Sequence, residues 1–369
     1  MSAPPPILQD LIGQEHASRF LASAVSHGEP SHAYLFHGPK GVGKYDAALK
    51  FAAALCCETG GCGECPSCEK AARGVHPDID AIAPVGAFIT IDQVREINRN
   101  LNLRPHESRA RVFILRGADR FNTDSANAFL KSLEEPPPFV YFLLIADRLD
   151  KLIPTIVSRC QPVRFGPVPA ADIEAHILGN YEISPVVAQA YARASRGNLH
   201  LAEALAANNK LSDRRERYLH IAENLAKGAW EGGASQMASE IIAAAAEQGD
   251  TAEQEEEENV PEGFLVAPKK KREQDAHRRA SQAQKRELDL ALDFLETWFR
   301  DMMAMASGAG EAILNRDYEL ELEAQSHESR IDNYCQALEV IEAARSKLSY
   351  NVDLELALQA MFYKLQEVL

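Results

Sequence analysis

Short apolar runs alternate with helical patterns over residues 1–165 of the chain. Each run has the length of one buried strand and is bounded by glycine or polar residues. The runs are SHAYLFHG (31–38), RVFIL (111–115), YFLLIA (141–146) and QPVRF (161–165). Between them, stretches such as 44–57 and 123–135 carry apolar residues at helical spacing. Buried strands that alternate with helices predict an α/β class with a parallel sheet covered on both faces.

The strand-like runs stop at about residue 167. Residues 167–208 contain short amphipathic patterns with Pro or Ser near their starts, which predict a small helical domain. Residues 209–369 carry helical stripes that predict a helical core. The clearest stripe comprises Leu288, Leu292, Leu295, Phe299 and Met302. We therefore predict three domains, an α/β domain at 1–166 followed by two helical ones.

Residues 248–275 differ from this pattern. They contain the acidic block EQEEEE and then the basic block KKKR, with prolines between the two. Such a composition predicts a flexible, solvated insertion. PKKKR (268–272) also fits a nucleic-acid patch or a localisation signal, but a charged loop is the interpretation that we favour.

Composition narrows the class of protein. The formal net charge is −15, whereas a protein that coats nucleic acid non-specifically is normally basic. Any contact with DNA must then be local or made through partners. No apolar run reaches the roughly 18 residues that span a bilayer, and the N-terminus lacks a basic stretch followed by an apolar core. We expect a cytoplasmic protein that makes no membrane contact.

Residues 38–45 read GPKGVGKY, a glycine-rich turn between an apolar run and a helical pattern. A phosphate-binding P-loop requires this context, because backbone N–H groups at the start of a helix cradle the phosphate oxygens. Gly38, Gly41 and Gly43 are predicted to form the cradle, and Lys44 to neutralise the phosphates. A chance glycine-rich turn is the alternative that this context disfavours.

The groups that hold Mg²⁺ in a working P-loop are missing at their expected positions. A Ser or Thr hydroxyl should follow the P-loop lysine, but the chain has Tyr45, whose phenol oxygen lies too far from the backbone to ligate the same ion. An acidic pair should follow the run RVFIL, but the chain has Arg116 and Gly117. The sequence therefore predicts a phosphate cradle without ATP hydrolysis.

Two alternatives exist for the missing carboxylate. Asp119 follows the same run but stands three residues too late to be the direct equivalent. Alternatively, the acidic strand is the run 141–146, which Asp147 and Asp150 follow, although the nearby Ser-Arg-Cys motif assigns that segment another role.

Five of the seven cysteines lie between residues 56 and 68. In a cytosolic protein such a cluster indicates a metal site rather than disulfides. Cys62, Cys65 and Cys68 form two overlapping C-x-x-C steps, and one more thiolate, from Cys57 or Cys56, would complete a tetrahedral Zn²⁺ site. A closed site with four sulfur ligands is structural rather than catalytic.

Two other interpretations of this region are weaker. A redox pair is disfavoured because three evenly spaced cysteines leave no obvious disulfide partner. His76 follows the cluster and is another candidate ligand, but Pro77 more simply fixes the start of the strand DIDAI.

The motifs LIGQEHA (11–17), NAFLKSLEEPP (127–137) and Ser-Arg-Cys (158–160) accompany the P-loop and the cysteine cluster. With these motifs, the chain resembles bacterial clamp-loader subunits of the AAA+ class, most closely the delta-prime type of DNA polymerase III. The resemblance covers the whole chain and is strongest at 8–205. It implies a P-loop α/β domain, a small helical lid domain and an all-α C-terminal collar domain.

The resemblance also assigns roles to single residues. It implies that Arg159 is an arginine finger that acts in trans on a neighbouring subunit's ATP site, because its planar, always-charged fork suits γ-phosphate oxygens. The alternative is a surface arginine in a local ion pair. Ser158 and Cys160 would shape the turn. Cys57 aligns with the family's first zinc cysteine, and His200 in GNLH replaces the nucleotide-sensing arginine of the motor subunits.

The implied function is that of a delta-prime-like stator, which helps load the sliding clamp onto primed DNA without hydrolysing ATP. The implied partners are the gamma/tau and delta subunits of the clamp loader and, through the complex, the sliding clamp and primer-template DNA. Zn²⁺ is the implied structural cofactor, and ATP binding is expected to be weak or absent at this vestigial cradle. The alternatives are an active gamma/tau-like motor ATPase and a stand-alone zinc-dependent DNA-binding factor, which the net charge of −15 disfavours.

Overall fold

The chain divides into two compact units, which are described separately below. The computed structural model describes residues 5–28, 30–84, 88–229, 233–258, 269–348 and 352–369. Unit 1 comprises Met1–His176 and Ser195–Leu201, and unit 2 comprises Ile177–Ala194 and Ala202–Leu369. The small helical segment at 167–208 is thus shared between the two units, and the division into three domains stays a prediction.

Unit 1 is built on a five-stranded parallel sheet in the order β2-β3-β4-β1-β5. Its strands are β1 (Ala33–His37), β2 (Ile79–Ile82), β3 (Arg111–Arg116), β4 (Val140–Ala146) and β5 (Gln161–Arg164). The prediction of a P-loop α/β domain with a parallel sheet is confirmed, and each of the four apolar runs contains a strand. β1, β3 and β4 are buried along most of their length, which explains why they are continuous apolar runs without alternation.

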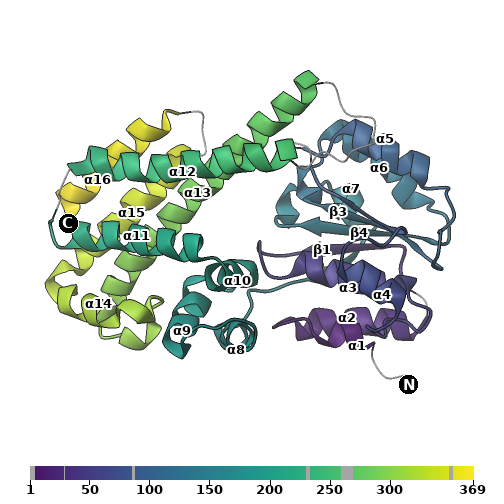
Figure 1. Ribbon diagram of the computed structural model, residues 1–369, viewed down its shortest axis with the longest axis horizontal. Helices are drawn as coiled ribbons and strands as arrows, with labels where there is room; N and C mark the ends of the chain where they lie inside the picture. Colours follow the sequence, from purple (N-terminus) through teal and green to yellow (C-terminus); the bar gives the residue numbers. More distant parts are fainter. Residues whose placement is uncertain (1–4, 29, 85–87, 230–232, 259–268, 349–351) are drawn as a thin grey trace. The chain divides into compact units, whose positions relative to one another are not determined.

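Helices cover both faces of this sheet (Figure 1). α5 (Ile91–Asn100), α6 (Thr123–Glu134) and α7 (Pro154–Val157) cover one face, and α1 (Pro6–Gln9), α2 (Glu15–Ser26), α3 (Lys44–Cys56) and α4 (Pro66–Ala72) cover the other. Short 3₁₀ turns follow β3 and β4, namely η1 (Ala118–Arg120) and η2 (Leu149–Lys151). Phe129 of α6 packs edge-on against Phe142 of β4, with 5.1 Å between the ring centroids. Aromatic packing of this kind fixes α6 on the sheet.

The carboxyl ends of β1, β3 and β4 meet at one edge of the sheet. His37, the last residue of β1, pairs with the last residue of β4, and Arg116 ends the neighbouring β3. In open parallel sheets, ligands bind outside this edge, where loops from adjacent strands come together. The segments that carry the P-loop, Gly117 and Asp147 all begin here.

Unit 2 contains no strand among its described residues. Its helices are α9 (Pro185–Ala194), α11 (Asn209–Ala226), α12 (Gly233–Glu258), α13 (Lys269–Ala306), α14 (Glu319–Gln325), α15 (Ile331–Leu348) and α16 (Leu354–Val368), with the 3₁₀ turns η3 (Gly310–Ala312), η4 (Arg316–Tyr318) and η5 (Glu328–Arg330). α8 (Ala170–Asn180) and α10 (Leu199–Ala207) cross the boundary between the units. The apolar stripe predicted on α13 is confirmed, since all five of its side chains are at most 2% exposed. None of the helices in the described part of the chain has the length and apolar character needed to span a bilayer.

The charged segment 248–275 is more helical than its composition predicted. α12 continues through the acidic block to Glu258, and α13 begins at Lys269 with the basic block. Glu, Gln, Lys and Arg are good helix formers, so each block extends the neighbouring helix. The flexibility predicted for 259–268 lies outside the described residues.

Candidate functional site

The segment after β1 forms the glycine-rich turn that the sequence predicted. Gly38, Gly41 and Gly43 have φ angles of 145°, 76° and 84°, in the region that favours glycine. A Cβ atom on Gly38 would lie 2.1 Å from the carbonyl oxygen of Phe165, so the chain that follows β5 also requires glycine there. Gly43 is the N-cap of α3 and Lys44 is its first residue. The turn therefore stands at the positive end of a helix, as in a phosphate-binding loop.

Lys44 is buried at the base of this turn, with 4% of its side chain exposed. Its Nζ atom donates hydrogen bonds to the carbonyl oxygens of Gly38 at 2.6 Å and Pro39 at 2.5 Å. Nζ also pairs with Asp147, directly after β4, whose Oδ1 lies 2.8 Å away. The lysine that neutralises phosphate in a P-loop thus has a carboxylate as its counter-charge in this chain.

At the positions that hold Mg²⁺ in a working P-loop, a cation is stacked on a phenol ring. The guanidinium carbon of Arg116 lies 4.5 Å from the ring centroid of Tyr45, within the range of a cation–π contact. Asp119, the alternative acidic residue, lies on η1 and makes none of the contacts of Lys44. Tyr45 and Arg116 therefore bring neither an aliphatic hydroxyl nor a carboxylate to these two positions.

The GNLH segment lies against the P-loop within unit 1. The backbone N–H of His200 donates to the carbonyl oxygen of Gly41 at 3.1 Å, and His200 Nε2 lies 3.3 Å from Oδ2 of Asp46. Asn198 approaches more closely, because a Cβ atom on Gly41 would lie 1.8 Å from its Oδ1. The structure thus places His200 beside the cradle. The resemblance implied that this histidine stands where motor subunits carry a nucleotide-sensing arginine.

The Ser-Arg-Cys motif follows α7. Arg159 pairs with Glu134 of α6, with 2.5 Å between Nη2 and Oε1, and its Nη1 donates to the carbonyl oxygen of Thr155 at 2.9 Å. The Arg159 side chain is 35% exposed. Cys160 belongs to the buried core, and burial raises the pKa of its thiol to about 12. Cys160 is therefore a small buried residue beside the turn, whereas the neighbouring arginine forms a local ion pair at the surface.

The four cysteines predicted as zinc ligands lie close together. The Sγ atoms of Cys57, Cys62, Cys65 and Cys68 are all within 4.8 Å of one another. Cys57 Sγ lies 3.8 Å from that of Cys62 and 3.7 Å from that of Cys65. Tetrahedral Zn–S bonds of about 2.3 Å place sulfur atoms about 3.8 Å apart, whereas a disulfide needs about 2.05 Å. These four residues fit a tetrahedral zinc ion.

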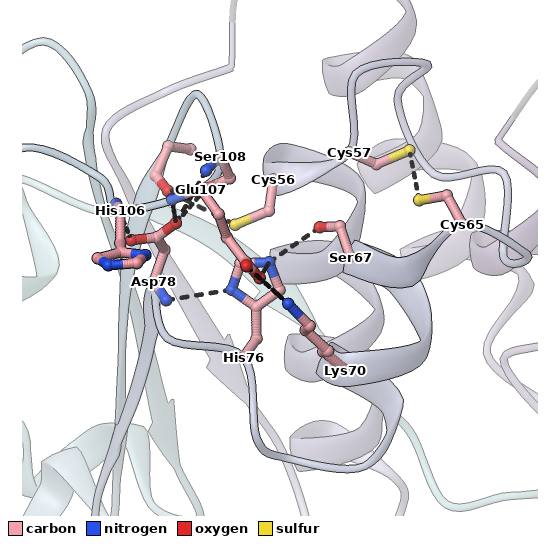
Figure 2. Close-up of polar contacts among 11 residues, drawn as sticks. Cys56, Cys57, Cys65, Ser67, Lys70, His76, Asp78, His106, Glu107 and Ser108 are labelled. Carbon is pink, nitrogen blue, oxygen red and sulfur yellow. Dashed lines mark hydrogen bonds and ion pairs between the residues drawn. The ribbon is translucent and has the colours of Figure 1, made fainter.

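Cys56, the reserve candidate, points away from this cluster. Its Sγ donates to the carbonyl oxygen of Ala110 at 3.6 Å, and Figure 2 shows it directed away from the sulfur atoms of Cys57 and Cys65. Burial raises the pKa of Cys56 to about 12. Burial also acts to raise the pKa of Cys57, but hydrogen bonds from Thr59 and from nearby backbone N–H groups outweigh it and lower that pKa to about 5. Cys57, whose sulfur lies within the four-cysteine cluster, is thus the better ligand of the two.

Asp78 has a structural role that the sequence did not reveal. It is fully buried, and its carboxylate accepts hydrogen bonds from the backbone N–H groups of His106, Glu107 and Ser108 at 2.5, 3.0 and 2.9 Å, and from the Ser108 hydroxyl at 2.9 Å. Burial alone would raise the pKa of Asp78, but these donors outweigh it and lower the pKa. The local sequence does not predict this role, because the partners of Asp78 lie 28 to 30 residues further along the chain.

His76 connects the cysteine cluster to this network (Figure 2). Its Nδ1 accepts a hydrogen bond from the backbone N–H of Asp78 at 3.1 Å, so Nε2 carries the proton and donates to Ser67 Oγ at 2.9 Å. Burial lowers the pKa of His76 and keeps the ring neutral. Lys70, on the same helix as Ser67, pairs with Glu107 at 2.6 Å. His76 is thus engaged outside the four-cysteine cluster and links α4 to Asp78, while Lys70 links α4 to the segment before β3.

The parallel sheet, the glycine-rich turn and its buried lysine define a P-loop nucleotidase fold. A family model described as "DNA polymerase III, delta subunit" matches residues 13–169. The chain is 32% identical to DNA polymerase III subunit delta' of Bacillus subtilis over 215 residues, which are 58% of this chain and 65% of the relative. It is 41% identical to subunit delta' of Pseudomonas aeruginosa over 136 residues, which are 35% of this chain and 42% of the relative. It is 36% identical to subunit tau of Escherichia coli over 207 residues, which are 53% of this chain and 32% of the relative.

Residues 13–169 are thus similar to clamp-loader subunits of DNA polymerase III. In each of these three matches the chain spans less than two thirds of the relative's own length. A solved structure of a gamma-subunit-related protein from Thermotoga maritima is similar at a TM-score of 0.43 and 16% identity, covering 94% of this chain and 98% of that one. A similarity of that size carries no further conclusion.

The buried carboxylate of Asp78 generates a stability prediction. We expect Asp78→Asn to lower the free energy of unfolding by about 3 kcal/mol at pH 7, because an amide cannot accept all the hydrogen bonds that the charged carboxylate accepts. The folded-state pKa of Asp78 lies below its unfolded value. Its contribution is therefore complete above the unfolded pKa of about 3.9 and disappears as the pH falls through the folded value.

Urea unfolding at pH 7 and at pH 3 measures this difference. The gap between the wild type and Asp78→Asn should narrow at the lower pH. Asp92→Asn is the matched control, since Asp92 is 77% exposed and pairs with Arg95 at 3.2 Å within α5. That change should cost less than about 1 kcal/mol. Equal stabilities of Asp78→Asn and the wild type at pH 7 would contradict the role of Asp78.

Proposed function

We propose that the chain is a delta-prime-like subunit of the bacterial clamp loader, which helps place the sliding clamp on primed DNA without hydrolysing ATP itself. The observation that carries this proposal is a phosphate cradle with the Tyr45–Arg116 stack at its metal positions. The curated relatives of the delta' and tau types support a clamp-loader subunit over the matched residues. The partners in this proposal are the gamma/tau and delta subunits, the sliding clamp and primer-template DNA.

The absence of ATP hydrolysis follows from the chemistry of the metal. Mg²⁺ neutralises the charge that develops on the phosphates, and it is held by oxygen ligands at about 2.0–2.1 Å. Arg116 brings a positive charge where such an oxygen is needed, and the ring of Tyr45 holds the guanidinium in place. A divalent cation would be repelled at this position.

Arg159 is proposed to act on the ATP site of a neighbouring subunit. Its pair with Glu134 is partly exposed on both sides, at 35% and 47%. Such pairs contribute only about 0–1 kcal/mol, so the more highly charged γ-phosphate can replace Glu134. Burial of Cys160 fixes the backbone beside the arginine, which limits where its side chain can reach.

The four cysteines are proposed to hold a structural Zn²⁺. Their closed set of four sulfur ligands leaves no open coordination position for catalysis. When bound, the metal joins the end of α3 to α4. His76, Ser67 and Lys70 then fasten this module to the rest of unit 1.

The domain assignment belongs to the same proposal. Residues 1–166 are the AAA+ domain, 167–208 the lid, and 209–369 the collar that packs with other subunits. A second candidate, an active motor ATPase, has in its favour the similarity to subunit tau over 53% of this chain.

Turnover of ATP separates these two candidates. The purified chain is expected to release no phosphate above background with Mg·ATP, because the hydroxyl and the carboxylate are replaced at the metal positions. Lys44→Ala should then change nothing. Turnover like that of a motor subunit, lost in Lys44→Ala, would identify a motor ATPase.

The finger role predicts a defect only in the assembled complex. Arg159→Ala should fold and assemble normally and lower the ATPase of the complex reconstituted with motor subunits. The lost ATPase activity should equal the contribution of one ATP site of the complex. At such a site an arginine finger accelerates hydrolysis by about 10³–10⁵. Glu134→Gln is the control, since it removes the local ion pair and keeps the arginine. If both variants retain full complex ATPase, Arg159 is only a surface residue.

Removal of one proposed zinc ligand tests the metal centre. Cys65→Ser should reduce the zinc content from one ion per chain to near zero and lower the melting temperature, because metal binding supplies folding free energy. Mass spectrometry measures the zinc content, and circular dichroism measures the melting temperature. Cys335→Ser, at an exposed cysteine outside the cluster, should change neither. Equal zinc contents of Cys65→Ser and the wild type would refute the site.

A further inference from the structure

Lys44 has no hydrogen-bond donor left for a phosphate. A lysine ammonium carries three N–H groups, and three acceptors surround its Nζ atom. They are the carbonyl oxygens of Gly38 and Pro39 and Oδ1 of Asp147, at 2.6, 2.5 and 2.8 Å. Since a P-loop lysine contacts phosphate oxygens, one of these acceptors must leave before the cradle can be filled.

Asp147 is the charged acceptor among the three. It directly follows β4, and β4 pairs with β1, so the carboxylate stands beside the turn that β1 leads into. Its side chain is 42% exposed, whereas that of Lys44 is 4% exposed. An anion that approaches Lys44 from solvent therefore meets a like charge that already neutralises the lysine.

The turn is held in this conformation from two sides. Gly38 lies against the backbone of Phe165, and the carbonyl oxygen of Gly41 accepts a hydrogen bond from the backbone N–H of His200. The side chain of Asn198 lies where a Cβ atom on Gly41 would stand. The Lys44–Asp147 pair is therefore formed inside a braced turn rather than at a loose loop.

We propose that Asp147 determines the specificity of the cradle by standing where a phosphate would stand, and so keeps nucleotide out. The inference deepens the proposed function and rests on it only in assigning the cradle to an ancestral nucleotide site. The competing role for Asp147 is that of a Mg²⁺ ligand after an alternative acidic strand. The two roles give opposite results when the charge is removed.

The test is the affinity of the full-length chain for a fluorescent ribose-labelled ATP, measured by anisotropy in EDTA and again in Mg²⁺. Asp147→Asn keeps the size of the side chain and removes its charge. It should bind at least ten-fold more tightly than the wild type in EDTA, and the gain should vanish in the double variant Lys44→Ala/Asp147→Asn. Asp150→Asn is the matched control, because Asp150 lies in the same segment and pairs with Arg148 at 2.7 Å. It should bind like the wild type.

Thermal melting gives an independent readout. A ligand that binds only the folded state raises the melting temperature, so ATP should stabilise Asp147→Asn more than the wild type. Asp147→Ser repeats both measurements if the asparagine variant does not fold.

Two outcomes overturn the inference. One is a folded Asp147 variant with the affinity of the wild type. The other is a variant that gains nothing in EDTA and loses binding in Mg²⁺, which makes Asp147 a metal ligand. The proposed function fails separately, on ATP turnover, which these binding measurements do not report.

Discussion

A lysine ammonium that is almost completely removed from water requires a negative partner, because an unpaired buried charge costs several kcal/mol. In a P-loop that partner is a phosphate. In this chain the partner is the carboxylate of Asp147, whose Oδ1 lies 2.8 Å from Lys44 Nζ. Two carbonyl oxygens accept the other hydrogen bonds of the ammonium group. The pairing of β1 with β4 places the two charges side by side. The turn, the helix start and the edge of the sheet thus form a neutral and closed arrangement without a ligand.

Those elements that are buried along their whole length could be predicted from the sequence. β1, β3 and β4 are buried on both faces, so hydrophobicity alone marks them, and the same holds for the buried stripe of α13. The charged blocks before Glu258 and after Lys269 were predicted as loop, but their described residues are helical. A solvated helix and a solvated loop share one composition. The helix propensity of Glu, Gln, Lys and Arg continues α12 and α13 into these blocks, so the charge pattern alone did not distinguish the two.

The same distinction between local and distant information applies to the site. The glycine-rich turn and the cysteine cluster are local motifs, and their spacing was enough to find them. The pair Lys44–Asp147 joins residues 103 positions apart, and the partners of Asp78 lie 28 to 30 residues away. The sequence offers Asp147 as an alternative acidic residue, but its contact with the lysine depends on the pairing of β1 with β4. Spacing likewise could not decide between Cys56 and Cys57, whereas the direction of each side chain at the end of α3 does.

The Tyr45–Arg116 stack has a consequence for the evolution of the chain. Its two members stand on different elements, the first turn of α3 and the end of β3. Replacing the tyrosine alone leaves a guanidinium at the metal position, and replacing the arginine alone leaves a phenol ring in place of the hydroxyl. Neither single replacement restores a complete set of oxygen ligands. Under the proposed loss of ATP hydrolysis, a metal site at these positions would therefore require both replacements together.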